Sequence, residues 1–106
     1  MSVVEIKKEA SGAKGVSRNK ILDFDQGIVI NLQLKAGETI PRHHANTDVI
    51  VYVASGEVLF GVEEDQHRLK EGSLLHMKPF EKHDIEAIKD ASLLVFKIGS
   101  NPRCSL

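Results

Sequence analysis

"GETIPRHHANTDVIVYVASGE", residues 37–57, is the most informative part of the chain. Residues 49–53 are rich in β-branched side chains and lead to a Ser-Gly pair, a pattern typical of a strand that ends in a turn. Two adjacent histidines, His43 and His44, stand just before this strand, and the acid Asp48 lies between them and it. The stretch therefore predicts a strand and, beside it, a candidate metal or acid–base site.

A period of two runs through most of the chain. Ile28, Ile30, Leu32 and Leu34 share one parity and alternate mostly with polar residues, which predicts a half-buried strand. Further strands are predicted over residues 49–53, 57–62, 67–72 and 72–79, followed by a hairpin over 83–98 that turns near 89–91. Residues 4–10 fit a short helix or a strand equally well. Short antiparallel strands at spacings of about ten residues predict an all-β sandwich or barrel.

Composition limits the classes of partner. The chain has 106 residues, enough for one domain over residues 1–106, and a net charge of −1 from 14 basic and 15 acidic side chains. Without a basic excess to follow a phosphate backbone, nucleic acid is not expected as a partner. No apolar run approaches the length of a membrane span, and the N-terminus lacks the features of a signal peptide. With a single cysteine, Cys104, no intramolecular disulfide is expected, and we predict a cytoplasmic protein without a membrane partner.

Two segments of the chain resemble the two motifs of the cupin superfamily. Residues 37–57 are similar to G-x5-H-x-H-x3-4-E-x6-G, and "GSLLHMKPFEKH", residues 72–83, is similar to the start of G-x5-P-x-G-x2-H-x3-N. The resemblance covers about residues 27–98. It implies a double-stranded β-helix, or jelly-roll barrel, of two antiparallel sheets, and it implies a homodimer. Because one fold hosts many unrelated chemistries, the resemblance does not name a reaction.

The alignment with these motifs retains two of the four family ligands. Counting from Gly37, the first family histidine falls on His43, and the last histidine of the second motif falls on His83. The second family histidine and the glutamate fall on Ala45 and Val49. The second motif also departs from the pattern at a glycine position, which is Phe80 here. Two imidazoles alone would hold a divalent ion weakly, since catalytic sites usually supply three protein ligands.

Whether Asp48 or His44 completes the ligand set depends on the backbone between them. Successive strand side chains face opposite sides, so with His43 facing inward, His44 and Asp48 are expected to face outward. A bulge within residues 45–48 would turn Asp48 inward. His43, His83 and Asp48 would then approximate the two-histidine, one-carboxylate set that suits iron, manganese or zinc. The cofactor is therefore either absent or a divalent metal, Zn, Mn, Fe or Ni, held by these two histidines with Asp48 or His44.

These residues leave three functions open. The first is a cytoplasmic binding module for a small organic ligand, with weak or no metal binding. The second is a metal-dependent oxygenase, isomerase or decarboxylase of a small acid, and the third is a metal-free isomerase that uses His43 and His83 as acid and base. The catalytic residues stay undetermined, with these two histidines as candidates. A largely apolar pocket is expected to be lined by His43, His83, Val51, Val53, Met77 and Phe80.

Overall fold

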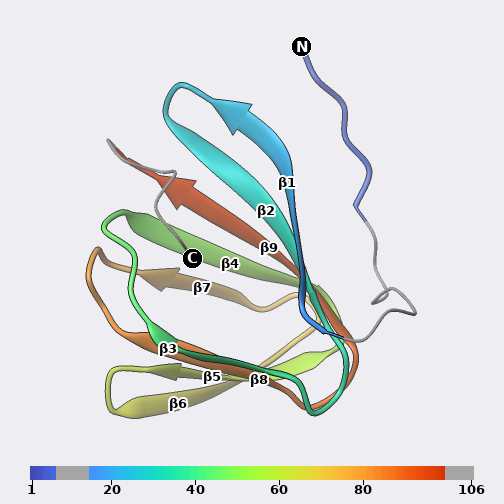
Figure 1. Ribbon diagram of the computed structural model, residues 1–106, viewed down its shortest axis with the longest axis vertical. Coiled ribbons are helices and arrows are strands. Elements are labelled where there is room, and N and C mark those ends of the chain that lie inside the picture. Colours follow the sequence, from blue (N-terminus) through green and yellow to red (C-terminus); the bar gives the residue numbers. More distant parts are fainter. Residues whose placement is uncertain (7–14, 100–106) are drawn as a thin grey trace.

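The computed structural model describes residues 1–6 and 15–99, and all of the regular structure in these ranges is β-strand (Figure 1). The strands are β1 (Ser17–Phe24), β2 (Gly27–Leu34), β3 (Thr39–His43), β4 (Asp48–Ser55), β5 (Glu57–Val62), β6 (Asp65–Lys70), β7 (Leu74–Met77), β8 (His83–Ala87) and β9 (Ala91–Ile98). Within these ranges no helix is long and apolar enough to span a membrane. Of the segment 4–10, residues 4–6 have no regular structure and residues 7–10 lie outside the described part, as does Cys104.

The strands form two antiparallel sheets that face each other. The larger sheet has the order β1-β2-β9-β4-β7, and the smaller has the order β3-β8-β5-β6. The chain passes between the sheets several times, so strands that follow one another in sequence often lie in different sheets (Figure 1). This arrangement confirms the prediction of a jelly-roll barrel of two antiparallel sheets.

The predicted hairpin over residues 83–98 is wrong. β8 lies in the four-stranded sheet between β3 and β5, whereas β9 lies in the five-stranded sheet between β2 and β4. Residues 88–90 therefore carry the chain from one sheet to the other. Both β8 and β9 alternate buried and more exposed side chains, as predicted. Alternation within a strand, however, does not determine which other strand it pairs with.

Two strands escaped the sequence analysis, β1 and β3. In β1 the register with β2 shifts between Lys20 and Leu22, and in β3 the register with β8 shifts between Ile40 and His43. A register shift of this kind inserts a residue and changes the face on which the following side chains lie. The regular alternation that marks the other strands is therefore interrupted in these two.

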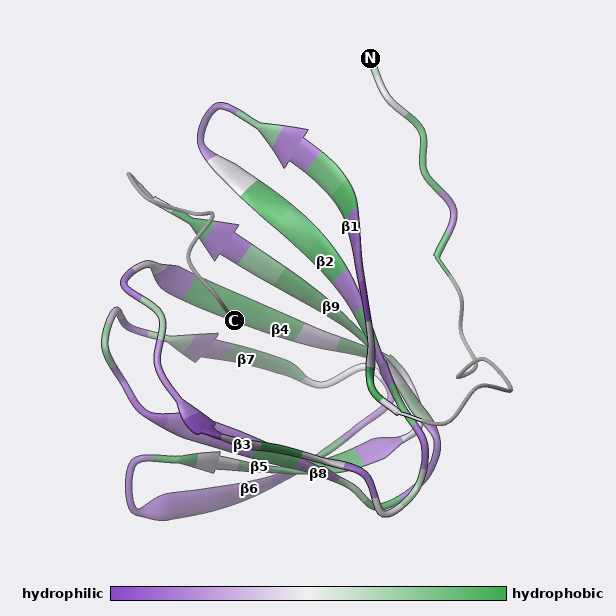
Figure 2. Ribbon diagram, in the orientation of Figure 1, coloured by the Kyte–Doolittle hydropathy of each residue, from purple (hydrophilic) through white to green (hydrophobic). Residues whose placement is uncertain are grey.

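The core lies between the two sheets. Figure 2 shows hydrophobic residues along β2, β9 and β4, while most of β6 is hydrophilic. The buried apolar side chains come from both sheets and include Leu32, Leu34, Val51, Val53, Val58, Phe60, Ile85, Leu93 and Val95. Side chains at alternate positions of each strand thus meet their counterparts from the opposite sheet, as in other packed β-sandwiches.

β2 is buried on both faces, contrary to the prediction of a half-buried strand. Asn31 and Gln33, on the polar parity, are only 2% and 1% exposed. The Nδ2 amide of Asn31 donates hydrogen bonds to Ser92 Oγ at 2.9 Å and to the carbonyl oxygen of Leu93 at 3.0 Å. Burial of this amide is tolerated because its donors are satisfied within the sheet.

Candidate functional site

Two crossings between the sheets lie at the same end of the barrel. Residues 44–47 connect β3 to β4, and residues 78–82 connect β7 to β8 (Figure 1). The backbone N–H of Phe80 in the second crossing donates a hydrogen bond of 2.7 Å to the carbonyl oxygen of Ala45 in the first. We call this part of the molecule the histidine end, because His43 closes β3 and His83 begins β8 there.

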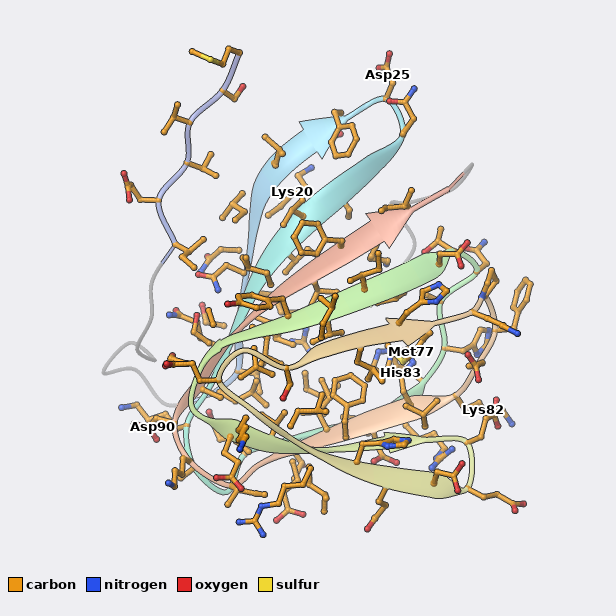
Figure 3. All side chains as sticks on the ribbon, turned by 180° about the vertical axis from the view of Figure 1, so that it is seen from behind. Lys20, Asp25, Met77, Lys82, His83 and Asp90 are labelled. Atoms are coloured by element: carbon orange, nitrogen blue, oxygen red, sulfur yellow. The ribbon has the colours of Figure 1, made fainter. Side chains whose placement is uncertain are left out.

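His43 and His83 are direct neighbours in the sheet and their rings touch. Their Cα atoms are partners in the β3–β8 register, and their ring centroids are 4.3 Å apart at an interplanar angle of 66°. His83 is 1% exposed, and the ring of Phe60 stacks on its other side with centroids 6.0 Å apart. Figure 3 shows His83 in the part of the molecule where β7 ends at Met77. Two imidazoles from separate motifs thus form one pair.

Each imidazole makes a hydrogen bond to a backbone carbonyl oxygen through Nδ1, while its Nε2 has no hydrogen-bond partner. Nδ1 of His43 lies 2.8 Å from the carbonyl oxygen of Pro41, and Nδ1 of His83 lies 3.1 Å from that of Glu81. A carbonyl oxygen only accepts, so each Nδ1 carries a proton, and the neutral form of each ring has its lone pair on Nε2. Both Nε2 atoms are buried, and neither finds a hydrogen-bond partner in the structure. Buried polar atoms without a partner are rare, and each of these two can accept a hydrogen bond or bind an ion.

Burial keeps His83 neutral. Its pKa is lowered from the ordinary value of 6.5, chiefly because burial penalises the charged ring, while the carbonyl of Glu81 opposes this effect. The neighbouring ring of His43 lowers the pKa further. A neutral ring at neutral pH keeps its Nε2 lone pair available to a hydrogen-bond donor or to a metal ion.

The histidine pair offers two ligands for a metal ion. Two imidazoles that bind one ion through nitrogens at about 2 Å have ring centres roughly 4.5 Å apart at a right angle and roughly 5 Å apart at the tetrahedral angle. The centroids of His43 and His83, at 4.3 Å, are close to the shorter of these spacings. Among residues 1–6 and 15–99, however, no three His, Cys, Asp or Glu side chains come together as a metal-binding group. An ion held here would therefore take its remaining ligands from water or from a bound molecule.

The structure does not bring Asp48 to the histidine pair. Asp48 begins β4 on the same face as Ile50 and Tyr52, and its Oδ1 lies 2.9 Å from Nε2 of His76 on the outer face of the large sheet. Both side chains of this hydrogen-bonded pair are about half exposed, at 50% for Asp48 and 55% for His76. Residues 46–47 do form an irregular bend, but the chain leaves it with Asp48 facing outward. The two-histidine, one-carboxylate set is therefore not formed in this structure.

His44 and Phe80 lie together at the surface. Their ring centroids are 6.0 Å apart, and both side chains are exposed. Phe80 has a φ of 70°, in the left-handed region that costs an L-residue roughly 1–2 kcal/mol. This conformation explains why the resembling motif has glycine at the position. Phe80, 63% exposed, thus faces solvent, away from the barrel interior where the pocket was expected.

The other predicted pocket residues are buried. Val51 and Val53 are 1% and 0% exposed and belong to the apolar core between the sheets. Met77 is also 1% exposed and pairs with Val49 across the β4–β7 register, so it lies on the inner face at the histidine end. Of these three, Met77 is the residue nearest to the crossings that carry His43 and His83.

Lys97 is a residue of the histidine end that the sequence analysis missed. It lies on β9 with no exposed surface, and its register partners are Ile28 on one side and Val49 on the other. It shares the parity of Leu93 and Val95, both in the core, so its side chain starts from the inner face. In "LLVFKI", residues 93–98, strand alternation places Lys97 on the same face as Leu93 and Val95. The sequence alone could therefore have predicted that this lysine faces inward.

A groove on the outer face of the small sheet is separate from the histidine pair. Its volume is about 260 Å³, and its lining includes Thr39, Arg42, Leu59, Asp84 and Glu86. Arg42 and Asp84 form an ion pair of 3.2 Å in this lining. None of the lining residues is a member of the histidine pair.

The strands and the paired histidines define a small β-barrel of the double-stranded β-helix class, with its polar groups at one end. A sequence model described as "Cupin domain" matches residues 31–99, which is more than half of the chain. The chain belongs to the cupin family. The search of curated proteins found no match.

Several solved structures share the fold. An RmlC-like cupin family protein from Methanocaldococcus jannaschii is 23% identical, with a TM-score of 0.75 over 93% of this chain and 94% of that one. KdgF from a Halomonas species is 18% identical, with a TM-score of 0.74 over 92% and 90% of the two chains. A conserved protein of unknown function from Streptococcus pyogenes is 17% identical, with a TM-score of 0.76 over 93% and 96%. At these identities the comparison establishes the fold alone.

Proposed function

We propose that this cupin is a binding module that holds a small organic ligand at the histidine end of its barrel. The observation that carries the proposal is the pair of buried Nε2 atoms of His43 and His83, neither of which has a hydrogen-bond partner. Leaving a buried polar atom unsatisfied costs about 1–3 kcal/mol, so a ligand that presents hydrogen-bond donors would recover that cost. The ligand would place an O–H or N–H group on each imidazole.

The fixed tautomers support the same proposal. The carbonyl oxygens of Pro41 and Glu81 hold the Nδ1 protons, so the orientation of both rings is set before any ligand arrives. A preorganised site loses little entropy when it binds. The stacking of Phe60 on His83 further restricts that ring.

A metal-dependent enzyme is the second candidate, because the same geometry suits a divalent ion. Histidines that ligate a metal usually donate their other ring N–H to a carbonyl or carboxylate, which is the arrangement seen for His43 and His83. A divalent ion held by two imidazoles would have several coordination positions open to a small acid. In such an enzyme, an oxygenase, isomerase or decarboxylase, the ion would act as a Lewis acid, and the two histidines would hold it.

A ligand screen with matched variants tests the proposal. The purified full chain is first analysed by native mass spectrometry for retained molecules and then screened against a metabolite library by thermal shift. We expect at least one molecule to raise the melting temperature of the wild type, and this increase to be lost in His43→Gln and in His83→Gln. His67→Gln, at an exposed position of β6, serves as the control and should keep the full increase. Stabilisation that persists in both His43→Gln and His83→Gln would contradict the proposal.

Metal content separates the two candidates. Elemental analysis of the purified protein, with thermal shifts measured on addition of Zn, Mn, Fe and Ni, reports whether an ion binds to the histidine pair. A stoichiometric ion that is lost in His43→Gln and His83→Gln would favour the enzyme. Binding of the organic ligand in the presence of a chelator would favour the binding module.

A further inference from the structure

Glu63 contacts the residue that precedes each of the two histidines. It is the first residue of the two-residue turn between β5 and β6, since Val62 and Asp65 are register partners. Its backbone N–H donates to the carbonyl oxygen of Lys82 at 2.8 Å, and its Oε1 accepts from the backbone N–H of Lys82 at 3.0 Å. Its carbonyl oxygen accepts from Nη2 of Arg42 at 2.9 Å. In Figure 1 this turn lies on the side of the molecule where the two crossings lie.

The backbone of Glu63 has a conformation that is unfavourable for a glutamate. Its φ of 52° lies in the left-handed region, where short hairpin turns usually have glycine, asparagine or aspartate. Glycine would fit this backbone better, but it would lack the carboxylate that accepts from Lys82. Strained residues of this kind are concentrated at functional sites, where the surrounding contacts hold them in place. The conformation therefore indicates that the side chain of Glu63 has a role of its own.

One peptide group connects Glu63 to the ring of His83. The N–H of Lys82 and the carbonyl of Glu81 belong to the same planar peptide unit, so the direction of one sets the direction of the other. The N–H of this unit donates to the carboxylate of Glu63. Its carbonyl oxygen accepts from Nδ1 of His83 at 3.1 Å. The carboxylate of Glu63 thus acts on the imidazole through two consecutive hydrogen bonds, which strengthen each other.

The same turn is also tied to the strand that carries His43. The register between β3 and β8 shifts after Ile40 and resumes only where His43 pairs with His83, so the ladder is interrupted just before the histidine pair. Arg42, next to His43, bonds to the carbonyl oxygen of Glu63 and links this irregular part of β3 to the turn. The backbone on both sides of the histidine pair is therefore held by one residue.

We propose that Glu63 is a positioning residue of the histidine end, which keeps the proton of His83 on Nδ1 and its lone pair on Nε2. Without the carboxylate, the peptide group before His83 would be free to turn, and Nδ1 would lose its fixed acceptor. The ring would then also populate the tautomer with the proton on Nε2, which donates instead of accepting. This inference rests on the proposed function, since the fixed tautomer matters to a ligand that donates to Nε2.

NMR of the full chain labelled with ¹⁵N tests this role without any ligand. At a pH of about 7.5, where an ordinary histidine is neutral, the resonances of the two ring nitrogens report which of them carries the proton. In Glu63→Ala we expect the amide hydrogen of Lys82 to exchange about tenfold faster, because its acceptor is gone. We also expect the Nδ1 and Nε2 resonances of His83 to move toward each other, because part of the population takes the other tautomer.

Three further variants separate the hydrogen bond from the shape of the turn. Glu63→Gln keeps an oxygen that accepts from Lys82 and should restore the wild-type resonances of His83. Glu63→Gly lacks the acceptor but suits the left-handed backbone, so its ring should behave as in Glu63→Ala while the protein is more stable. Glu64→Ala removes the neighbouring exposed carboxylate and should leave the ring unchanged. If Glu63→Ala does not fold, Glu63→Gly decides the question.

The outcomes separate this inference from the proposed function. Faster exchange at Lys82 with unchanged resonances of His83 would overturn the inference, because Glu63 would then support only the turn. Unchanged exchange at Lys82 in Glu63→Ala, or a ring in Glu63→Gln that behaves as in Glu63→Ala, would also overturn it. In these cases the proposed function is still judged by its own ligand screen. A wild-type His83 with its proton on Nε2 would instead contradict the proposed function, since that nitrogen would accept no hydrogen bond.

Discussion

At the scale of single residues, the histidine end is distinguished by the hydrogen bonds that its side chains make and by those that they lack. His43 and His83 have one ring nitrogen bound to a carbonyl and the other buried without a partner. Asp48, by contrast, has a partner in His76 at the surface and is not directed to the site. The alignment of the motifs selected His43 and His83, and the structure places the two rings side by side. It could not choose the partner of Asp48, because His76 lies 28 positions away in the chain.

The buried ring of His83 predicts a specific dependence of stability on pH. Its pKa is lowered in the folded state by burial, so the unfolded chain binds a proton more readily below pH 6.5. The free energy of unfolding should therefore be highest above pH 6.5 and fall as the pH drops through the lowered pKa. Urea denaturation of the wild type between pH 7.5 and pH 5 measures this, with both pH limits chosen to bracket a histidine pKa of about 6.5.

Two variants test whether His83 causes this dependence of stability on pH. In His83→Gln the loss of stability between neutral and acidic pH should be smaller than in the wild type, because the group that resists protonation is gone. His67→Gln, in which an exposed histidine is removed, should keep the wild-type dependence. An unchanged pH dependence in His83→Gln would show that His83 titrates normally in the folded protein.

At the scale of elements, the connections between strands control the fold. Gly56 joins β4 to β5, which lie in different sheets, with a φ of +85°. A Cβ atom at this position would overlap the backbone of Asp90 and Ala91, which lead into β9. Gly37 has a nearly identical φ of +88°, yet a Cβ atom there would meet no atom within 4 Å. These two glycines have the same backbone requirement and differ in the space around them.

This difference predicts unequal effects of alanine at the two turns. Gly37→Ala should cost roughly 1–2 kcal/mol of unfolding free energy, the penalty of a left-handed backbone. Gly56→Ala should cost more, because the crossing must also move away from Asp90 and Ala91. Urea denaturation of both variants provides the comparison. Equal losses would mean that the close approach at Gly56 relaxes without cost.

At the scale of the whole molecule, one face carries exposed apolar side chains. Leu74 is 68% exposed and Ile98 38%, and Tyr52, 37% exposed, is the direct register partner of Leu74. All three lie on the outer face of the large sheet, away from the core. Tyr52 and Leu74 are adjacent in the register, and neighbouring apolar side chains on a protein surface often mark an interface. With a net charge of −1, two copies of this chain would repel each other little.

We propose that this face forms the homodimer that the family resemblance implies. A two-fold axis would bring the patch of one copy onto the same patch of the other. Light scattering coupled to size exclusion should then give twice the mass of 11.7 kDa, and Leu74→Lys should reduce it to the mass of one chain. Gln66→Lys, on the outer face of the small sheet, serves as the control and should leave the mass unchanged. A wild type that elutes with the mass of one chain would contradict the proposal.

The class of fold could be predicted from the sequence, and the two motifs selected His43 and His83, whose rings the structure brings into contact. Alternation with a period of two is a local property of each strand, and the spacing from Gly37 to His43 belongs to one continuous motif. Only the tertiary structure shows which sheet each strand joins and that the side chain of Asp48 faces outward. Each of these depends on pairing between segments far apart in the chain, and side-chain alternation within a strand carries no information about its neighbour.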